Sequence, residues 1–201
     1  MEHRKHDVRR VFTAIMACVL ALAMGASITA CSDEKQTVSN VVSAELDGIK
    51  NPTQDYVDNL TESDSEYKQL CEDYGIDTLE FIKHSFGRLE YTIDDVTIDG
   101  DKATVDLTVN NADIDTAYRN ALTTIQNTDD PEILTLISNG DEKGLVQKAY
   151  QLYYDEIDKV GMVGETKVTF ELEKDDDGNW EVTDDSVDDF YNVLAPTLYS
   201  D

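Results

Sequence analysis

Residues 89–110, LEYTIDDVTIDGDKATVDLTVN, contain the pattern that decides the fold. In the second half, apolar and polar residues alternate, as they do in a strand with one buried and one exposed face. The apolar positions are Ala103, Val105, Leu107 and Val109. The turn signal Asp99-Gly100 precedes this strand, and the apolar phase of the first half changes at Asp94-Asp95, which predicts a β-bulge. The segment is therefore predicted to be an antiparallel hairpin.

A second hairpin is predicted from about Val163 to Val182. Val168, Phe170 and Leu172 alternate with polar or charged residues. The loop sequence DDDGN at 175–179 supplies the turn, and Trp180 opens the return strand. In the first hairpin the same alternation places Asp106 on the exposed face, which makes it a weak candidate for a buried general base.

Helical patterns flank and separate the two hairpins. The capping box Asp77-x-x-Glu80 and the pair Asp130-Pro131 mark two of the helix starts. The predicted helices cover about 52–60, 64–74, 77–87, 114–125, 130–139, 145–161 and 186–194. We therefore expect an α+β domain in which helices pack on a curved antiparallel sheet built from two hairpins.

This order of elements resembles the cone-shaped nuclear-transport-factor-2-like superfamily. The resemblance rests on the two hairpin motifs, Tyr91–Val109 and Phe170-x-x-x-Lys174-x-x-Asp177-Gly178-x-Trp180-x-Val182, and covers about residues 51–194. Both motifs look like hairpins of small lipoproteins of unknown function in Gram-positive bacteria that carry this domain. The helical segment between the hairpins is long, so a cystatin-like arrangement also stays open. Fold alone does not decide function.

The N-terminus has the composition of an export signal. Residues 1–10 carry net positive charge, and residues 11–30 contain no charged side chain. The tetrapeptide Ile28-Thr29-Ala30-Cys31 resembles the lipobox of bacterial lipoproteins. The resemblance implies cleavage between Ala30 and Cys31, a diacylglyceryl thioether on Cys31, and palmitate-type acyl chains that hold the protein on the extracellular face of the cell membrane. The alternative is that residues 11–30 stay uncut and span the bilayer.

Three parts of the chain follow from this interpretation. Residues 1–30 are the predicted signal peptide, residues 31–48 the lipidated Cys and a flexible tether, and residues 49–201 a single α+β domain. A tether of this length would hold the domain about 20 to 25 Å from the membrane surface.

The charge of the exported part excludes two classes of partner. After removal of residues 1–30 the chain has 12 basic and 41 acidic residues, a net charge of −29. Nucleic acid and anionic head groups would both repel it.

With Cys18 removed and Cys31 alkylated, Cys71 is the single remaining thiol, so no internal disulfide is predicted. Cys71 is interpreted as a small buried hydrophobic residue.

No catalytic signature or metal site is predicted. His84, the single His after residue 30, lies late in a short helix and is interpreted as a surface group. The acidic runs at 175–177, 184–185 and 188–189 suggest calcium, but an EF-hand register over 173–184 lacks the usual Asp start and Glu end. Solvated acids at a tight hairpin are the favoured interpretation, and no cofactor is expected.

The function predicted from these features is a membrane-anchored lipoprotein with a non-catalytic binding domain for a small ligand, peptide or partner protein. If the cone holds a pocket, its wall is predicted to be Tyr118, Tyr153, Phe170 and Trp180, although core packing of these rings is the favoured interpretation. Two alternatives stay open. One is a hydrolase or isomerase that uses a carboxylate inside the cone, and the other is a structural spacer in the envelope.

Overall fold

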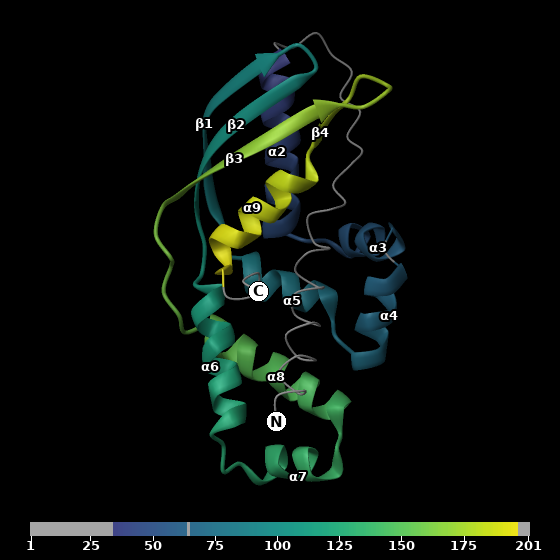
Figure 1. The fold of residues 1–201 in the computed structure, drawn as a ribbon, viewed down its shortest axis with the longest axis vertical. Helices are drawn as coiled ribbons and strands as arrows, with labels where there is room; N and C mark the ends of the chain where they lie inside the picture. Colours follow the sequence, from purple (N-terminus) through teal and green to yellow (C-terminus); the bar gives the residue numbers. More distant parts are fainter. Residues whose placement is uncertain (1–33, 64, 197–201) are drawn as a thin grey trace.

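The computed structural model describes residues 34–63 and 65–196, which form eight helices and one four-stranded sheet (Figure 1). The strands are β1 (Glu90–Asp99), β2 (Lys102–Asn110), β3 (Thr166–Lys174) and β4 (Trp180–Val182). The helices are α2 (Glu34–Lys50), α3 (Gln54–Ser63), α4 (Ser65–Tyr74), α5 (Thr78–Phe86), α6 (Ile114–Gln126), α7 (Pro131–Asn139), α8 (Glu142–Ile157) and α9 (Asp184–Leu194). The predicted α+β class, with two hairpins, is confirmed.

The sheet is antiparallel, with strand order β1-β2-β3-β4, and β1 does not pair with β4, so the sheet is open. The predicted bulge is present, because Ile93 pairs with Leu107 whereas Asp95 pairs with Asp106. Asp94, the extra residue, accepts hydrogen bonds from Thr108 Oγ1 at 2.7 Å and Lys167 Nζ at 2.8 Å. The bulge thus ties three strands together on the exposed face.

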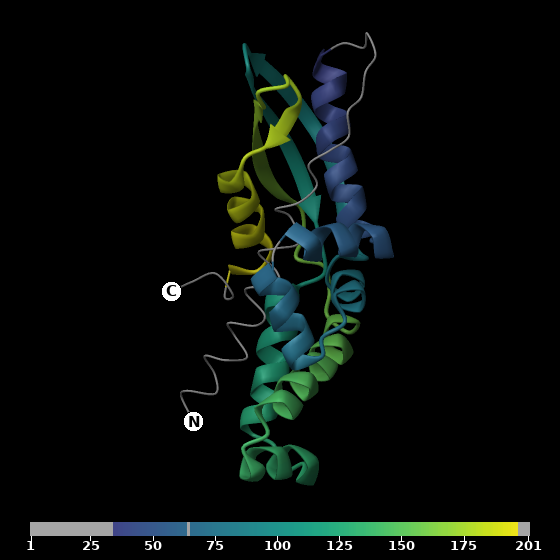
Figure 2. The same cartoon turned by 90° about the vertical axis from the view of Figure 1, so that its right-hand side faces the viewer.

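One face of the sheet is buried and covered by two helices. The alternating apolar residues of β2 and β3 are at most 6% exposed, as the sequence pattern predicts. Phe170 of β3 meets Phe190 of α9 with ring centroids 5.6 Å apart, and α2 contacts β1, β2 and β4 (Figures 1 and 2). The sheet, α2 and α9 therefore enclose one half of the core.

The tether predicted over residues 31–48 requires a correction. Residues Glu34–Lys50 form α2, so the part of the predicted tether from residue 34 to 48 belongs to the folded domain. The residues that α2 buries are Val38, Val42, Glu45, Leu46 and Ile49. The four apolar ones, all except Glu45, recur every three or four positions, which is the spacing of one helix face, and each is fully buried. The signal peptide and Cys31 lie outside the described residues.

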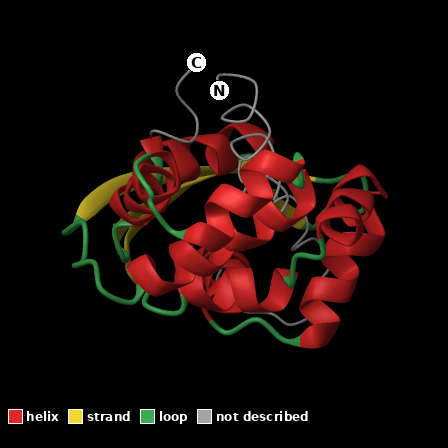
Figure 3. Ribbon diagram, turned by 90° about the horizontal axis from the view of Figure 1, so that it is seen from below, coloured by secondary structure: helices red, strands yellow, loops and turns green. Residues whose placement is uncertain are grey.

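The other half of the molecule is helical, and α7 lies at its far end (Figure 3, viewed from that end). Asp113, Asp130 and Asp141 cap α6, α7 and α8 by accepting hydrogen bonds from backbone N–H groups in the first turns. Gly140 ends α7 with a φ of 67°, a conformation that glycine adopts without strain. Helix α6 packs along α8, and the α3–α5 segment joins the two halves.

Candidate functional site

Two open clefts flank the turn between α4 and α5, and they share Gly75, Ile76 and Asp77. Their volumes are about 390 and 420 Å³. The turn is fixed locally, because Gly75 has a φ of 66° and Asp77 accepts a hydrogen bond from the N–H of Glu80 at 3.1 Å. Because both clefts border this turn, they are treated together as two lobes of one site, here called the α4–α5 groove.

The first lobe lies against α3 and α4. Its rim carries the exposed side chains of Asp58, Lys68 and Glu72. Below the rim lies Cys71, 7% exposed, whose Sγ accepts a hydrogen bond from Thr78 Oγ1 at 3.5 Å. The prediction that Cys71 is a buried small residue is confirmed. Its side chain forms an apolar floor below the charged rim of this lobe.

The second lobe lies against α8. Its lining combines Glu80 with two amides and two phenols from one face of α8, namely Gln147, Tyr150, Gln151 and Tyr154. Gln147 Nε2 donates to the carbonyl of Tyr74 at 2.9 Å, which joins α8 to the end of α4. Burial raises the pKa of the Tyr154 phenol further above neutrality. A tyrosine hydroxyl is protonated at neutral pH in any case and is able to donate.

The charge of the α4–α5 groove is predominantly negative. Its lining holds four acids, Asp58, Glu72, Asp77 and Glu80, and one base, Lys68. Glu80 forms an ion pair with Lys83 at 3.2 Å in which both side chains are about half exposed, so solvent screens much of its strength. The groove therefore offers acceptor oxygens, amides and aromatic rings to a ligand.

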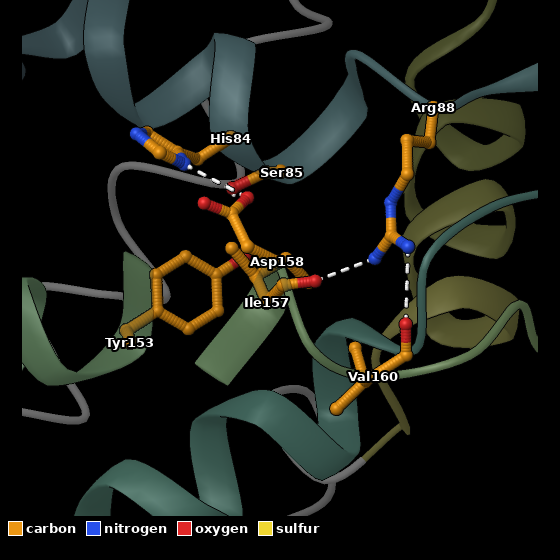
Figure 4. A network of polar contacts seen from close by, with 7 residues as sticks. All are labelled: His84, Ser85, Arg88, Tyr153, Ile157, Asp158 and Val160. Carbon is orange, nitrogen blue, oxygen red and sulfur yellow. Dashed lines mark hydrogen bonds and ion pairs between the residues drawn. The ribbon is translucent and has the colours of Figure 1, made fainter. Parts of the chain in front are cut away.

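A separate network clamps the end of α5 to the end of α8 (Figure 4). Ser85 Oγ lies 2.8 Å from the Tyr153 hydroxyl in the core. The Arg88 guanidinium donates to the carbonyls of Ile157 and Val160, the latter at 3.0 Å. A cation that satisfies carbonyls at a helix C-terminus also interacts favourably with the helix dipole. The network holds α5 and α8 in place and thereby positions the second lobe.

His84 takes part in the same clamp. Its ring stacks on Tyr154 with centroids 4.4 Å apart, and Nδ1 lies 3.4 Å from Asp158 Oδ1. The side chain is 28% exposed, so the predicted surface position is only partly right. Although Ser, His and Asp meet here, the Ser85 hydroxyl faces Tyr153 and is fully buried (Figure 4). A catalytic triad requires the Ser to hydrogen-bond to the His and reach substrate, so this is not one.

The four residues predicted for a pocket wall all lie in the core. Tyr118, Tyr153, Phe170 and Trp180 are 2%, 0%, 0% and 7% exposed. They belong to two regions, because Tyr153 contacts Phe81 in the helical half whereas Phe170 contacts Phe190 beneath the sheet. None of them lines the α4–α5 groove. Their positions match the favoured interpretation, core packing.

Glu45 is a candidate residue that sequence reasoning missed. It lies on α2 within the predicted tether, is 5% exposed, and its Oε1 has no hydrogen-bond partner among the described residues. Burial raises the pKa of this carboxyl to about 8, and burial first, then the charge of Glu45, raise the pKa of the nearby Tyr56 phenol. In the sequence, Glu45 lies beside the apolar stripe of α2, but the packing of α2 on the sheet, and not the stripe alone, shows that Glu45 is buried.

Among the side chains that the structure describes, no group of three or more His, Cys, Asp or Glu could hold a metal ion. Asp175 instead accepts hydrogen bonds from the Asp177 and Asn179 backbone N–H groups and from Asn179 Nδ2. These bonds, those from Asn179 foremost, lower the pKa of Asp175. Asp106 is exposed and accepts from Thr169 Oγ1 at 2.8 Å, so its predicted outward orientation is confirmed.

Comparison with known proteins gives little similarity. No family model matches the sequence, and no curated protein is similar to it. One solved structure that superimposes on the chain is ycdA from Bacillus subtilis, a protein named as a lipoprotein. The two are 16% identical, with a TM-score of 0.43 over 94% of this chain, which spans 56% of the length of the other. A similarity at this level identifies neither a family nor an activity.

None of the helices α2 to α9 is long and apolar enough to cross a membrane. Residues 11–30 lie outside the described ranges.

Proposed function

We propose that this protein is a lipid-anchored lipoprotein of the extracytoplasmic membrane face whose domain binds a ligand without catalysis. The observation that carries the anchor is the tetrapeptide Ile28-Thr29-Ala30-Cys31 at the end of the uncharged stretch of residues 11–30. Two acyl chains on Cys31 would give durable attachment, since each buried methylene contributes about 0.8 kcal/mol.

Metabolic labelling with an alkyne fatty acid tests the anchor. The wild-type protein is expected to incorporate the label and to remain with membranes after a high-salt wash. Cys31→Ser should abolish labelling and leave the signal peptide attached, which mass spectrometry detects. Cys18→Ser and Cys71→Ser are matched controls that keep the label, because Cys18 is removed with the signal and Cys71 is buried. A label that persists in Cys31→Ser would contradict the proposal.

The ligand site in this proposal is the α4–α5 groove. Its acids, amides and phenols suit a hydrophilic ligand with positive charge, such as a basic peptide segment. Carboxylates attract cationic side chains, and the four acids of the lining, Asp58, Glu72, Asp77 and Glu80, outnumber its one base, Lys68. The groove is open at the surface and extends on both sides of the α4–α5 turn, which suits an extended chain better than a fully enclosed small molecule.

A charge-matched pair of variants tests the site, because an acidic protein binds any polycation weakly. The groove variant is Asp58→Asn, Glu72→Gln and Glu80→Gln combined. The control variant neutralises three exposed acids elsewhere, Asp129→Asn, Glu165→Gln and Asp176→Asn. Calorimetric titration with a Lys-rich hexapeptide should show at least tenfold weaker binding for the groove variant than for the control. Equal binding by both variants would rule out the α4–α5 groove as the ligand site, and a structural spacer would then be the better explanation of the domain.

A second candidate function, a hydrolase or isomerase with an interior carboxylate, has one observation in its favour. Glu45 is buried with an unpaired oxygen and a raised pKa, which are properties of catalytic acids. It does not line the α4–α5 groove. Carbodiimide coupling of a small amine to Glu45 in the folded protein would show that substrates reach it. Protection of Glu45 up to the unfolding transition would eliminate this candidate.

A further inference from the structure

We infer that one end of the domain is a membrane-facing surface, and that the lipid anchor on Cys31 holds the first residue of this end, Glu34, within about 11 Å of the acylated Cys. This membrane-facing end consists of Glu34, the β1–β2 tip at 99–102 and the β3–β4 tip at 174–179. The inference rests on the proposed lipidation of Cys31 and adds to it an orientation and a distance. This distance replaces the separation of about 20 to 25 Å between domain and membrane that a flexible tether would give.

The distance follows from chain length. Cys31 and Glu34 are three residues apart in the sequence, and a fully extended chain spans at most about 3.3 to 3.6 Å per residue. Whatever conformation residues 32 and 33 adopt, the first residue of α2 therefore lies within about 11 Å of the acylated Cys. The acyl chains place that Cys at the membrane surface.

The start of α2 is fixed to the tips of both hairpins. Lys174 Nζ lies 2.7 Å from Glu34 Oε1 and 3.7 Å from Asp101 Oδ1, and it also lies 4.7 Å from the centroid of the Trp180 ring. Along the rest of α2, Val38, Val42, Leu46 and Ile49 are fully buried. The helix therefore cannot swing out as a tether without exposing core residues, and whatever holds Glu34 near the membrane holds the hairpin tips there too.

The same geometry places the α4–α5 groove away from the membrane. A helix rises 1.5 Å per residue, so the 17 residues of α2 span about 25 Å along the long axis of the molecule. The groove lies beyond Lys50, next to α3, α4 and α5, and α7 lies at the opposite end from the hairpin tips (Figures 1 and 2). Helix α2 thus acts as a rigid spacer that presents the groove to the exterior.

The charge of the membrane-facing end determines how it meets lipid. Its two lysines are engaged, Lys102 with Glu173 and Lys174 with Glu34. Asp99, Asp176 and Asp177 are exposed. Anionic head groups would repel this end over roughly a Debye length, about 8 to 10 Å at physiological salt, which is comparable to the reach of the anchor. We expect the end to stand off from anionic lipid and to approach neutral lipid.

Fluorescence quenching by a nitroxide on lipid head groups tests this orientation. The lipidated full-length protein is placed in phosphatidylcholine vesicles, with a dye at Asp176→Cys in the β3–β4 tip or at Asn139→Cys at the end of α7, both in a Cys71→Ser background. Quenching at position 176 should exceed that at 139 at least threefold. Phosphatidylglycerol in the vesicles should reduce it, and added salt should restore it.

Two controls make the outcomes separable. Insertion of about fifteen Gly/Ser residues between Asp33 and Glu34 should bring the two positions closer to equal quenching, because the domain then moves freely. A chain that begins at Ser32, and so lacks both the signal peptide and Cys31, should fail to associate with vesicles, which supports the anchor independently of orientation, whereas its continued association counts against the proposed function. Equal or greater quenching at position 139 in the lipidated protein would overturn the inference while leaving the anchor intact.

Discussion

The hydroxyl of Tyr153 lies 2.8 Å from Oγ of Ser85 in the core, and this contact joins α8 to α5. Asn111 Nδ2 donates to the Ser85 carbonyl at 2.9 Å, so the segment after β2 meets the same residue. Burial raises the pKa of the Tyr153 phenol, which stays neutral, although its bond to Ser85 partly opposes the shift. Three distant segments are thus connected at one fully buried serine.

Removal of the Tyr153 hydroxyl should therefore destabilise the domain more than removal of an exposed one. We predict that Tyr153→Phe lowers the free energy of unfolding by about 1 to 2 kcal/mol, since a buried Ser85 hydroxyl loses its partner. In urea titrations, the double variant with Ser85→Ala should cost clearly less than the sum of the single variants. Tyr91→Phe, which removes a partly exposed bond to Asp47, is the matched control and should cost less than about 0.5 kcal/mol. Strict additivity would contradict the prediction.

Glu45 should make the stability of the domain fall as pH rises. Its pKa is about 8 in the folded protein against 4.5 for a free glutamate, so the folded state holds a proton that the unfolded state releases between these values. Stability from this residue is therefore fully present below about pH 4.5 and is lost as pH rises toward 8. The slope approaches about 1.4 kcal/mol per pH unit within that window.

Glu45→Gln isolates this effect from the titration of the other acids. The variant keeps the shape of the side chain but does not ionise, so its unfolding free energy should exceed that of the wild type increasingly from pH 5 to pH 8. Denaturant titrations at four pH values give the difference directly. A difference that stays constant across the window would show that Glu45 is ionised in the folded state.

Arg88 should stabilise the C-terminus of α8 through its geometry as well as its charge. Its guanidinium reaches the carbonyls of Ile157 and Val160 at once, which a lysine ammonium matches poorly. We predict that Arg88→Lys and Arg88→Met both speed amide hydrogen exchange at the end of α8, with Met the faster. Arg119→Met removes an ion pair within α6, in which the Arg119 side chain is 57% exposed and that of Asp115 12%, and should leave amide exchange at the end of α8 unchanged.

The parts of the fold that were predicted from sequence are those with strong local signals. The alternation over residues 89–110, the phase change at Asp94 and the Asp caps each specify local geometry without reference to distant residues. Helix α2 has no such signals. Its apolar residues form a narrow stripe in a polar segment, and the stripe becomes informative only once the sheet that covers it is known.

The candidate site shows the same division. Asp77 and Gly75 were recognisable as a cap and a helix end, but the groove around them forms because α8 returns to this turn from some seventy residues further along the chain. Likewise, Tyr153 and Phe170 were identified as aromatic residues on apolar faces. Whether such rings line a cavity or fill a core depends on tertiary packing, which sequence periodicity does not contain.

Truncation tests the corrected domain boundary. A chain that begins at Glu34 should unfold cooperatively, with a free energy within about 1 kcal/mol of one that begins at Ser32. A chain that begins at Asn51 lacks the four fully buried apolar side chains of α2, whose burial contributes roughly 1.5 to 3 kcal/mol each. That sum is comparable to the whole stability of a small domain, so this chain should not fold. Circular dichroism melting distinguishes the three chains.

A pair of point variants separates loss of α2 packing from an unspecific loss of stability. Val42→Ala should lower the free energy of unfolding by about 1 to 3 kcal/mol, whereas Val163→Ala, at an exposed position, should change it little. If the chain that begins at Asn51 unfolds cooperatively, the residues of α2 are not needed for folding, and the interpretation of this segment as a tether would be correct.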